Sequence, residues 1–107
     1  MTYACSYEVP ATIEMYHEVC RLIGDDPMEG LTAHLVTRTE MGLRHLEVWE
    51  SEAAWRSFHT DRVQPAVHTV LKSVGFEEMP PEPPVEVLEL VDIQLGSQVA
   101  RFGMMGA

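Results

Sequence analysis

Two neighbouring segments of the chain carry alternating side chains that could do chemistry together. Their members are His34, Val36, Arg38, His45, Glu47 and Trp49. Side chains two positions apart on an extended strand point to the same face of a sheet. An imidazole can take up a proton near neutral pH, a nearby carboxylate raises its pKa, and an indole offers a large apolar wall. The spacing therefore predicts that these six side chains share one face of a sheet, with His45 near Arg38 and Glu47 as a candidate general base.

A hairpin would bring these two segments side by side. With Met41-Gly42 as a two-residue turn, His34 lies opposite Trp49. The other face of the hairpin is apolar and holds Ala33, Leu35, Leu46 and Val48. We expect that apolar face to pack against helices, and the Trp49 face to close on a second sheet around a partly polar cavity. Covering an indole stabilises a fold by roughly 2 to 3 kcal/mol. A solvated face with Trp49 partly covered by a dimer partner is the alternative.

The elements around this hairpin follow the order strand, helix, strand, strand, helix, strand. We expect strands over 3–9, 31–39, 43–50 and 85–93. Thr12 and Ser51 are placed to cap the two helices, and Pro65 either breaks or kinks the second helix or restarts it. The proline-rich residues 78–84 predict a stiff, extended connection. This order is typical of the ferredoxin-like α+β fold, a four-stranded antiparallel sheet with helices on one face.

Length, charge and cysteine content narrow the class of protein. The 107 residues fit one domain over 1–93, followed by a tail over 94–107 that is either a dimer arm or a frayed end. The formal net charge of -10 argues against nucleic-acid and anionic-membrane partners, since both need a basic patch. No apolar run approaches the roughly 18 residues of a membrane span, and no signal peptide is visible. With two cysteines and no CxxC pair, we expect a cytoplasmic protein.

The segment Glu47-Val-Trp-Glu-Ser-Glu-Ala-Ala-Trp55, with Phe58 and Pro65-Ala66 beyond it, resembles the dimeric α/β-barrel superfamily, nearest to its antibiotic-biosynthesis-monooxygenase-like branch. The resemblance implies a homodimer with sheets face to face. Each subunit would keep a cavity for a small aromatic or polyketide-like molecule, between sheet and helices or at the sheet's inner side. It implies oxidation without a cofactor, with Trp49 and His45 as candidate catalytic residues lining the pocket. The candidate substrate contacts are His34, Val36, Arg38, Glu47, Trp55 and His59. Relative to the family pattern, His45 stands in place of an asparagine and Trp55 in place of a tyrosine.

Other hypotheses stay open at this level. Haem-degrading members of the superfamily pair the same tryptophan with a histidine about ten residues later, and Trp49 and His59 have that spacing. Haem is therefore the alternative cofactor, although strand 3–9 lacks the asparagine that those members use. No HExxH or Cys/His ligand spacing is present, so we assign no metal ligands, although His34, His45 and Glu47 share a face and could meet around zinc. A non-enzymatic binding or structural dimer is the third hypothesis.

Overall fold

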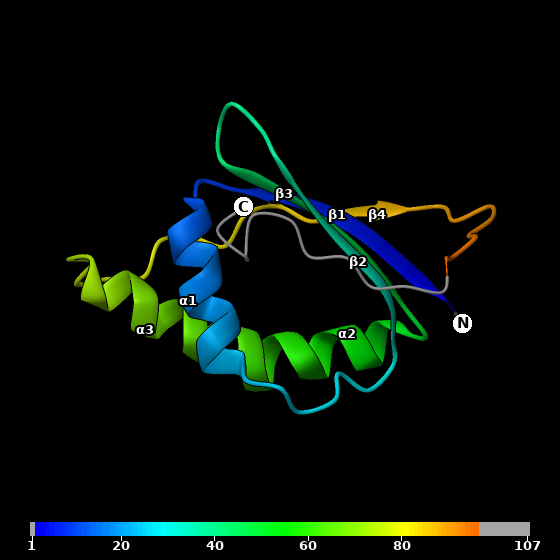
Figure 1. Cartoon of the computed structure of the whole chain (residues 1–107), viewed down its shortest axis with the longest axis horizontal. Coiled ribbons are helices and arrows are strands. Elements are labelled where there is room, and N and C mark those ends of the chain that lie inside the picture. Colours follow the sequence, from blue (N-terminus) through cyan, green and yellow to red (C-terminus); the bar gives the residue numbers. More distant parts are fainter. Residues whose placement is uncertain (1, 97–107) are drawn as a thin grey trace.

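The computed structural model describes residues 2–96 and has the predicted element order (Figure 1). Its strands are β1 (Tyr3–Val9), β2 (Leu31–Arg38), β3 (Leu43–Trp49) and β4 (Glu86–Leu88). Its helices are α1 (Ile13–Ile23), α2 (Glu52–Phe58), the π-helical turn η1 (His59–Val63) and α3 (Gln64–Ser73). The strands form one antiparallel sheet in the order β2-β3-β1-β4, with the helices on one side of it. The predicted ferredoxin-like α+β fold is confirmed.

Both helix starts follow from the predicted caps. Thr12 Oγ1 accepts a hydrogen bond of 3.1 Å from the Met15 amide at the start of α1, and the Ser51 hydroxyl does the same for Ala54 at the start of α2. These bonds satisfy amide groups that a helix leaves unpaired in its first turn. No helix in residues 2–96 is long and apolar enough to cross a membrane. Residues 97–107 of the predicted tail lie outside the described residues.

Pro65 restarts the second helical segment and does not break it. It lies in the first turn of α3, directly after η1, where the Gln64 amide bonds the His59 carbonyl five residues back. Proline has no amide hydrogen, and in a regular helix its ring meets the carbonyl four residues earlier. The wider π-helical turn therefore coincides with the position where regular α-helical bonding would be interrupted. Such turns recur at functional sites, and His59 is the first residue of this one.

The hairpin between β2 and β3 has a different register from the one predicted. Arg38 pairs with Leu43, Val36 with His45, and His34 with Glu47, so the prediction that His34 faces Trp49 is wrong. The connection is four residues long and is closed by a 2.8 Å bond from the Thr39 amide to the Gly42 carbonyl. The slip is two residues, which changes cross-strand partners and preserves the side-chain set on each face.

Strand β4 is shorter than the predicted strand over 85–93. Leu88 pairs with Ala4, and the partner strand β1 begins at Tyr3. Residues 90–96, the last that the structure describes, therefore have no opposing residues in β1, and Val91 is 91% exposed. Residues 85–93 have the sequence pattern of a strand. A strand also needs backbone hydrogen bonds to a neighbouring strand, and β1 does not extend far enough to supply them.

The helices cover the face opposite to the one that we expected. Trp49 is 1% exposed and its ring lies 5.3 Å from that of Phe58 in α2, whereas Leu35 on the other face is 57% exposed. The prediction that the indole points away from the helices is therefore wrong. Both faces of the hairpin carry apolar side chains, so a period of two cannot rank them. The aromatic residues of α2, Trp55 and Phe58, supply the partners that enclose the indole.

Candidate functional site

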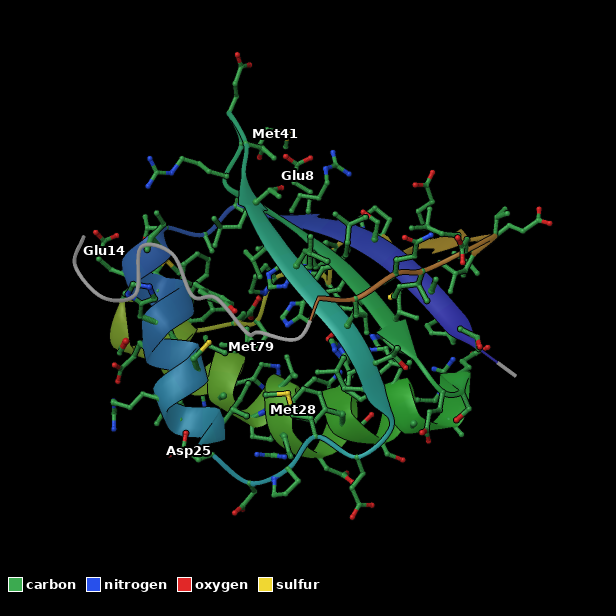
Figure 2. All side chains as sticks on the ribbon, turned by 45° about the vertical axis from the view of Figure 1, so that its right-hand side comes forward. Glu8, Glu14, Asp25, Met28, Met41 and Met79 are labelled. Carbon is green, nitrogen blue, oxygen red and sulfur yellow. The ribbon has the colours of Figure 1, made fainter. Side chains whose placement is uncertain are left out.

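A cluster of polar and aromatic side chains lies on the helix-covered face of the sheet. Its members, here called the central cluster, are Tyr7, Tyr16, His34, His45, Glu47 and Trp49. Three neighbouring strands and α1 supply them, because β1 and β2 flank β3. Met28, which Figure 2 labels, is one of the side chains that pack against the buried core between the sheet and the helices. The cluster therefore combines residues that are far apart in the sequence.

The carboxylate of Glu47 is the buried anion of the cluster, with 6% of the residue exposed. Trp49 Nε1 donates to Glu47 Oε1 at 2.8 Å, and the Tyr7 hydroxyl donates to Oε2. A buried carboxylate is costly unless its oxygens are hydrogen-bonded, and both are. Burial raises the pKa of Tyr7 far above its usual range, and the neighbouring Glu47 charge raises it further. Tyr7 is consequently a fixed hydrogen-bond donor.

Two histidines form the second half of the cluster. His34 Nε2 and His45 Nδ1 lie 2.9 Å apart, so one ring donates and the other accepts. Burial lowers the pKa of His45 to about 4, helped by His34 and opposed by Glu47. Burial also lowers the pKa of His34, again against the pull of Glu47. At neutral pH the pair is therefore two neutral imidazoles.

Ring contacts fix His45 and leave His34 nearer to solvent. The His45 ring stacks on Tyr7 with centroids 4.8 Å apart and meets the ring of Tyr16 in α1 edge-on at 5.7 Å. His45 is 8% exposed, whereas the side chain of His34 keeps 26% of its exposure. His34 thus lies at the rim of the cluster, on edge strand β2.

The other predicted site residues fall into two groups. Val36 pairs with His45 and is half-buried, and Arg38 lies exposed at the hairpin end of β2. Trp55 belongs to the buried core with Trp49, and His59 stacks on Trp55 at 5.2 Å. His59, Gln64 and Glu82 form a separate polar group, here called the helix cluster, in which His59 Nε2 lies 2.8 Å from Glu82 Oε1. To ligate haem iron, His59 would have to exchange this carboxylate for the metal.

Sequence reasoning missed three residues of this face. Tyr7 holds Glu47, Tyr16 touches His45, and Cys5 lies opposite Glu47 on β1. Burial, with Glu47 nearby, raises the pKa of the Cys5 thiol to about 12, so it is inert at neutral pH. The period of two in residues 3–9 already places Cys5 and Tyr7 on one face. The ferredoxin-like order places that strand beside residues 43–49, so the signal for these two was present.

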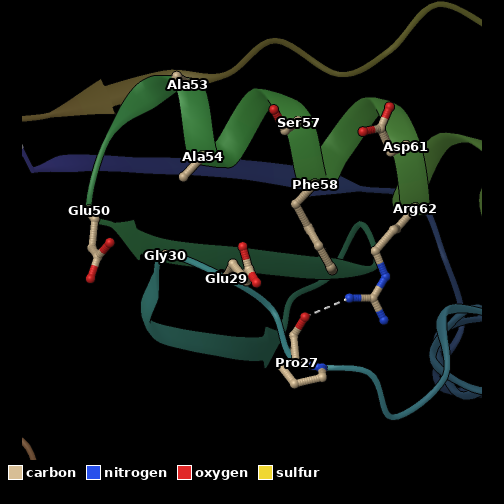
Figure 3. Close-up of a pocket in the computed structure, with 10 residues that line it drawn as sticks. All are labelled: Pro27, Glu29, Gly30, Glu50, Ala53, Ala54, Ser57, Phe58, Asp61 and Arg62. Atoms are coloured by element: carbon tan, nitrogen blue, oxygen red, sulfur yellow. Dashed lines mark hydrogen bonds between the residues drawn. The ribbon is translucent and has the colours of Figure 1, made fainter.

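A surface hollow of about 480 Å³ lies elsewhere, between α2 and residues 27–30 (Figure 3). Phe58 and Arg62 line it, together with the carboxylates of Glu29, Glu50 and Asp61. The Arg62 guanidinium is already engaged, because it donates to the Pro27 carbonyl at 3.0 Å and to two further carbonyls. None of the central-cluster residues lines this hollow, and its acidic wall suits an aromatic ligand poorly.

No family model and no curated protein matches the sequence. The fold is similar to that of a protein of unknown function from Nitrosomonas europaea, with a TM-score of 0.60 and 14% identity over 92% of this chain and 98% of that chain. It is also similar to the monooxygenase from the gene ActVA-Orf6 of Streptomyces coelicolor, solved in complex with nanaomycin D. There the TM-score is 0.50 and the identity 18%, over 90% of this chain and 92% of that chain. At these identities the likeness shows the fold alone, which this chain shares with both proteins.

Proposed function

We propose that the chain is a monooxygenase-like enzyme that oxidises a small aromatic molecule at the central cluster, with His45 and Trp49 at its centre. The observation that carries this proposal is the pair of neutral imidazoles held beside a fully hydrogen-bonded buried carboxylate. A structural core gains more stability from apolar side chains than from such a network. Groups of this kind under a helix layer are typical of a functional site.

The chemistry that fits this site is oxidation of a phenolic substrate that carries an activated methylene group. The carbon loses two hydrogens and gains one oxygen atom of O₂, and the other oxygen atom leaves as water. The substrate itself supplies the electrons, so the reaction needs no cofactor. A neutral His45 accepts a hydrogen bond from the substrate hydroxyl, and His34 passes the proton toward solvent. Trp49 supplies the apolar contact.

The substrate would reach the cluster along the edge strand β2. His34 is the partly exposed member of the histidine pair, and Val36 and Arg38 follow it on the same face of that strand. Entry at this edge leaves the contacts between α2 and Trp49 in place. Val36 then provides an apolar contact near the imidazoles, and Arg38 can meet an anionic or carbonyl group of the substrate at the outer end.

The proposed enzyme is a homodimer that closes over the uncovered face of the sheet. Leu35 is 57% exposed there, and half-buried Leu46 and Val48 continue the same apolar face. Exposed apolar patches on a sheet mark association surfaces. Sedimentation velocity should show a dimer for the intact chain and a monomer for Leu35→Asp, whereas Met41→Asp at the hairpin tip should stay dimeric. A monomeric intact chain would remove the dimer from the proposal.

Turnover of an anthrone-type phenol tests the function, with the quinone product followed by its absorbance. His45→Ala should lower kcat by roughly 100-fold, because a positioned proton acceptor contributes on this scale. His68→Ala on α3 is the matched control and should keep full turnover. Trp49→Phe tests the indole without emptying the core. Equal turnover in His45→Ala and the control, with both variants folded, would remove His45 from the mechanism.

A further inference from the structure

We propose that His34, His45 and Glu47 together bind a divalent first-row transition-metal ion such as Zn²⁺ or Co²⁺. Each residue offers one donor atom, and the three atoms lie within 4.8 Å of one another. Within residues 2–96 this is the one group of three such side chains whose donors converge. Ion binding stands on this geometry, and only its effect on turnover rests on the proposed function.

The spacing of the two imidazoles suits a shared ion. Metal–nitrogen bonds to histidine are about 2.0 to 2.1 Å long, so two donors around a tetrahedral ion lie about 3.3 to 3.4 Å apart. His34 Nε2 and His45 Nδ1 are 2.9 Å apart, a separation that a small outward movement of His34 would adjust. A second separation is longer, with His34 Nε2 3.9 Å from Glu47 Oε2, and the three donor atoms span up to 4.8 Å. His34 lies at the rim of the cluster and can move toward an ion, and the side chains of His45 and Glu47 would also be drawn together by it.

Two ligands are already held in place by neighbouring groups. Trp49 Nε1 and the Tyr7 hydroxyl fix the two oxygens of Glu47, and Oε2 keeps a further lone pair for an ion. Tyr7 also stacks on the His45 ring. Hydrogen bonds that orient a ligand typically contribute 10- to 100-fold to metal affinity. The cluster therefore has both the donor set and the support that a metal site needs.

Charge favours a cation at this place. Two neutral imidazoles and one carboxylate give the site a single negative charge, inside a chain of net charge -10. Nitrogen and oxygen donors of this type suit Zn²⁺ and similar ions. The helix cluster offers less, because it has one histidine and one carboxylate, and Gln64 Nε2 already donates to that carboxylate at 2.9 Å. It serves as the internal comparison.

An ion at this site would inhibit the proposed oxidation. The ion takes the ring nitrogens that otherwise hydrogen-bond one another. When Nδ1 of His45 binds the ion, the ring proton of the neutral imidazole lies on Nε2, which then cannot accept a hydrogen bond from a substrate hydroxyl. Zn²⁺ would accordingly suppress turnover, and a chelator would restore it.

Titration of the chelator-treated full chain with Co²⁺, followed by visible absorption, tests binding directly. We expect saturation at one Co²⁺ per chain, displacement by Zn²⁺, and quenching of tryptophan fluorescence. His34→Ala should weaken binding by at least roughly 100-fold, and Tyr7→Phe by about tenfold. His34 is at the rim, so that variant should fold, which circular dichroism checks. His59→Ala in the helix cluster should bind as the intact chain does.

Two results would overturn the site: no Co²⁺ absorption from folded protein, or binding that survives in His34→Ala. Turnover of the chelator-treated protein, measured before Co²⁺ is added, separates the two proposals. Co²⁺ binding by a protein that shows no turnover when metal-free supports the site and removes the proposed function. Turnover by the metal-free protein without Co²⁺ binding supports the function and removes the site.

Discussion

The two histidine clusters of this molecule contain similar groups and differ in what surrounds them. In the central cluster the carboxylate of Glu47 is 6% exposed and is held by Tyr7 and Trp49. In the helix cluster the side chain of Glu82 is 56% exposed and is held by Gln64 and His59. Burial makes the central cluster chemically unusual, whereas the helix cluster is exposed to solvent and is an ordinary polar contact. A histidine–carboxylate pair thus indicates a site only together with its burial.

The exposed pair has a structural role that follows from its position. Glu82 belongs to the proline-rich connection over 78–84, and its partners lie on the helical segment. The hydrogen bond from Gln64, and then that from His59, lowers the pKa of Glu82. The contact ties a stiff connection to the helix layer on its way to β4.

The largest expected difference between the clusters is in stability. Glu47→Ala leaves the Trp49 N–H and the Tyr7 hydroxyl unpaired in the core, which costs roughly 2 to 6 kcal/mol. Glu82→Ala removes an exposed contact and should cost less than about 1 kcal/mol. Urea unfolding of both variants measures the two losses. Similar losses would mean that burial does not separate the clusters.

Much of this comparison could be predicted from the sequence. Alternation placed His34, His45, Glu47 and Trp49 on one face, and the two-residue slip in the hairpin did not disturb that set. The side on which that face lies could not be predicted, because it depends on how Phe58 and Trp55 pack against the indole. The end of β4 likewise depends on where β1 begins, which the tertiary structure determines and the local sequence does not.

Acid should lower the free energy of unfolding through the central cluster, by a smaller amount than Glu47→Ala does. The folded pKa of His45 is about 4 against 6.5 for an ordinary histidine, so between these values the unfolded chain binds more protons than the folded one. The free energy of unfolding of metal-free protein should therefore fall as the pH drops from about 6.5 to 4, by on the order of 2 kcal/mol.

Glu82 in the helix cluster loses its contribution at the acid end of this window and below it. Glu82 has a lowered pKa, so its contribution is present above the ordinary value of 4.5 and is lost as the pH falls through its folded value. Denaturant unfolding across the range should give a flatter profile for His45→Asn than for the intact chain. An equal slope in that variant would assign the acid sensitivity to other groups.

The smallest effect is expected at the anchor of the proline-rich connection. Gln64→Ala removes the 2.9 Å bond to Glu82 and should change the free energy of unfolding by less than about 0.5 kcal/mol. Amide hydrogen exchange should become faster over residues 76–85, while turnover stays unchanged. A destabilisation as large as that of Glu47→Ala would show that the helix cluster is part of the core.

The most direct test of the central claim is to find where a small aromatic molecule binds. Imidazole resonances of the metal-free chain, followed by NMR during titration with an anthrone-type phenol, report on each histidine separately. The account predicts saturable shifts at His34 and His45, with His59 and His68 unchanged. Shifts confined to His59, or no shift at either central histidine while the ligand binds, would contradict it.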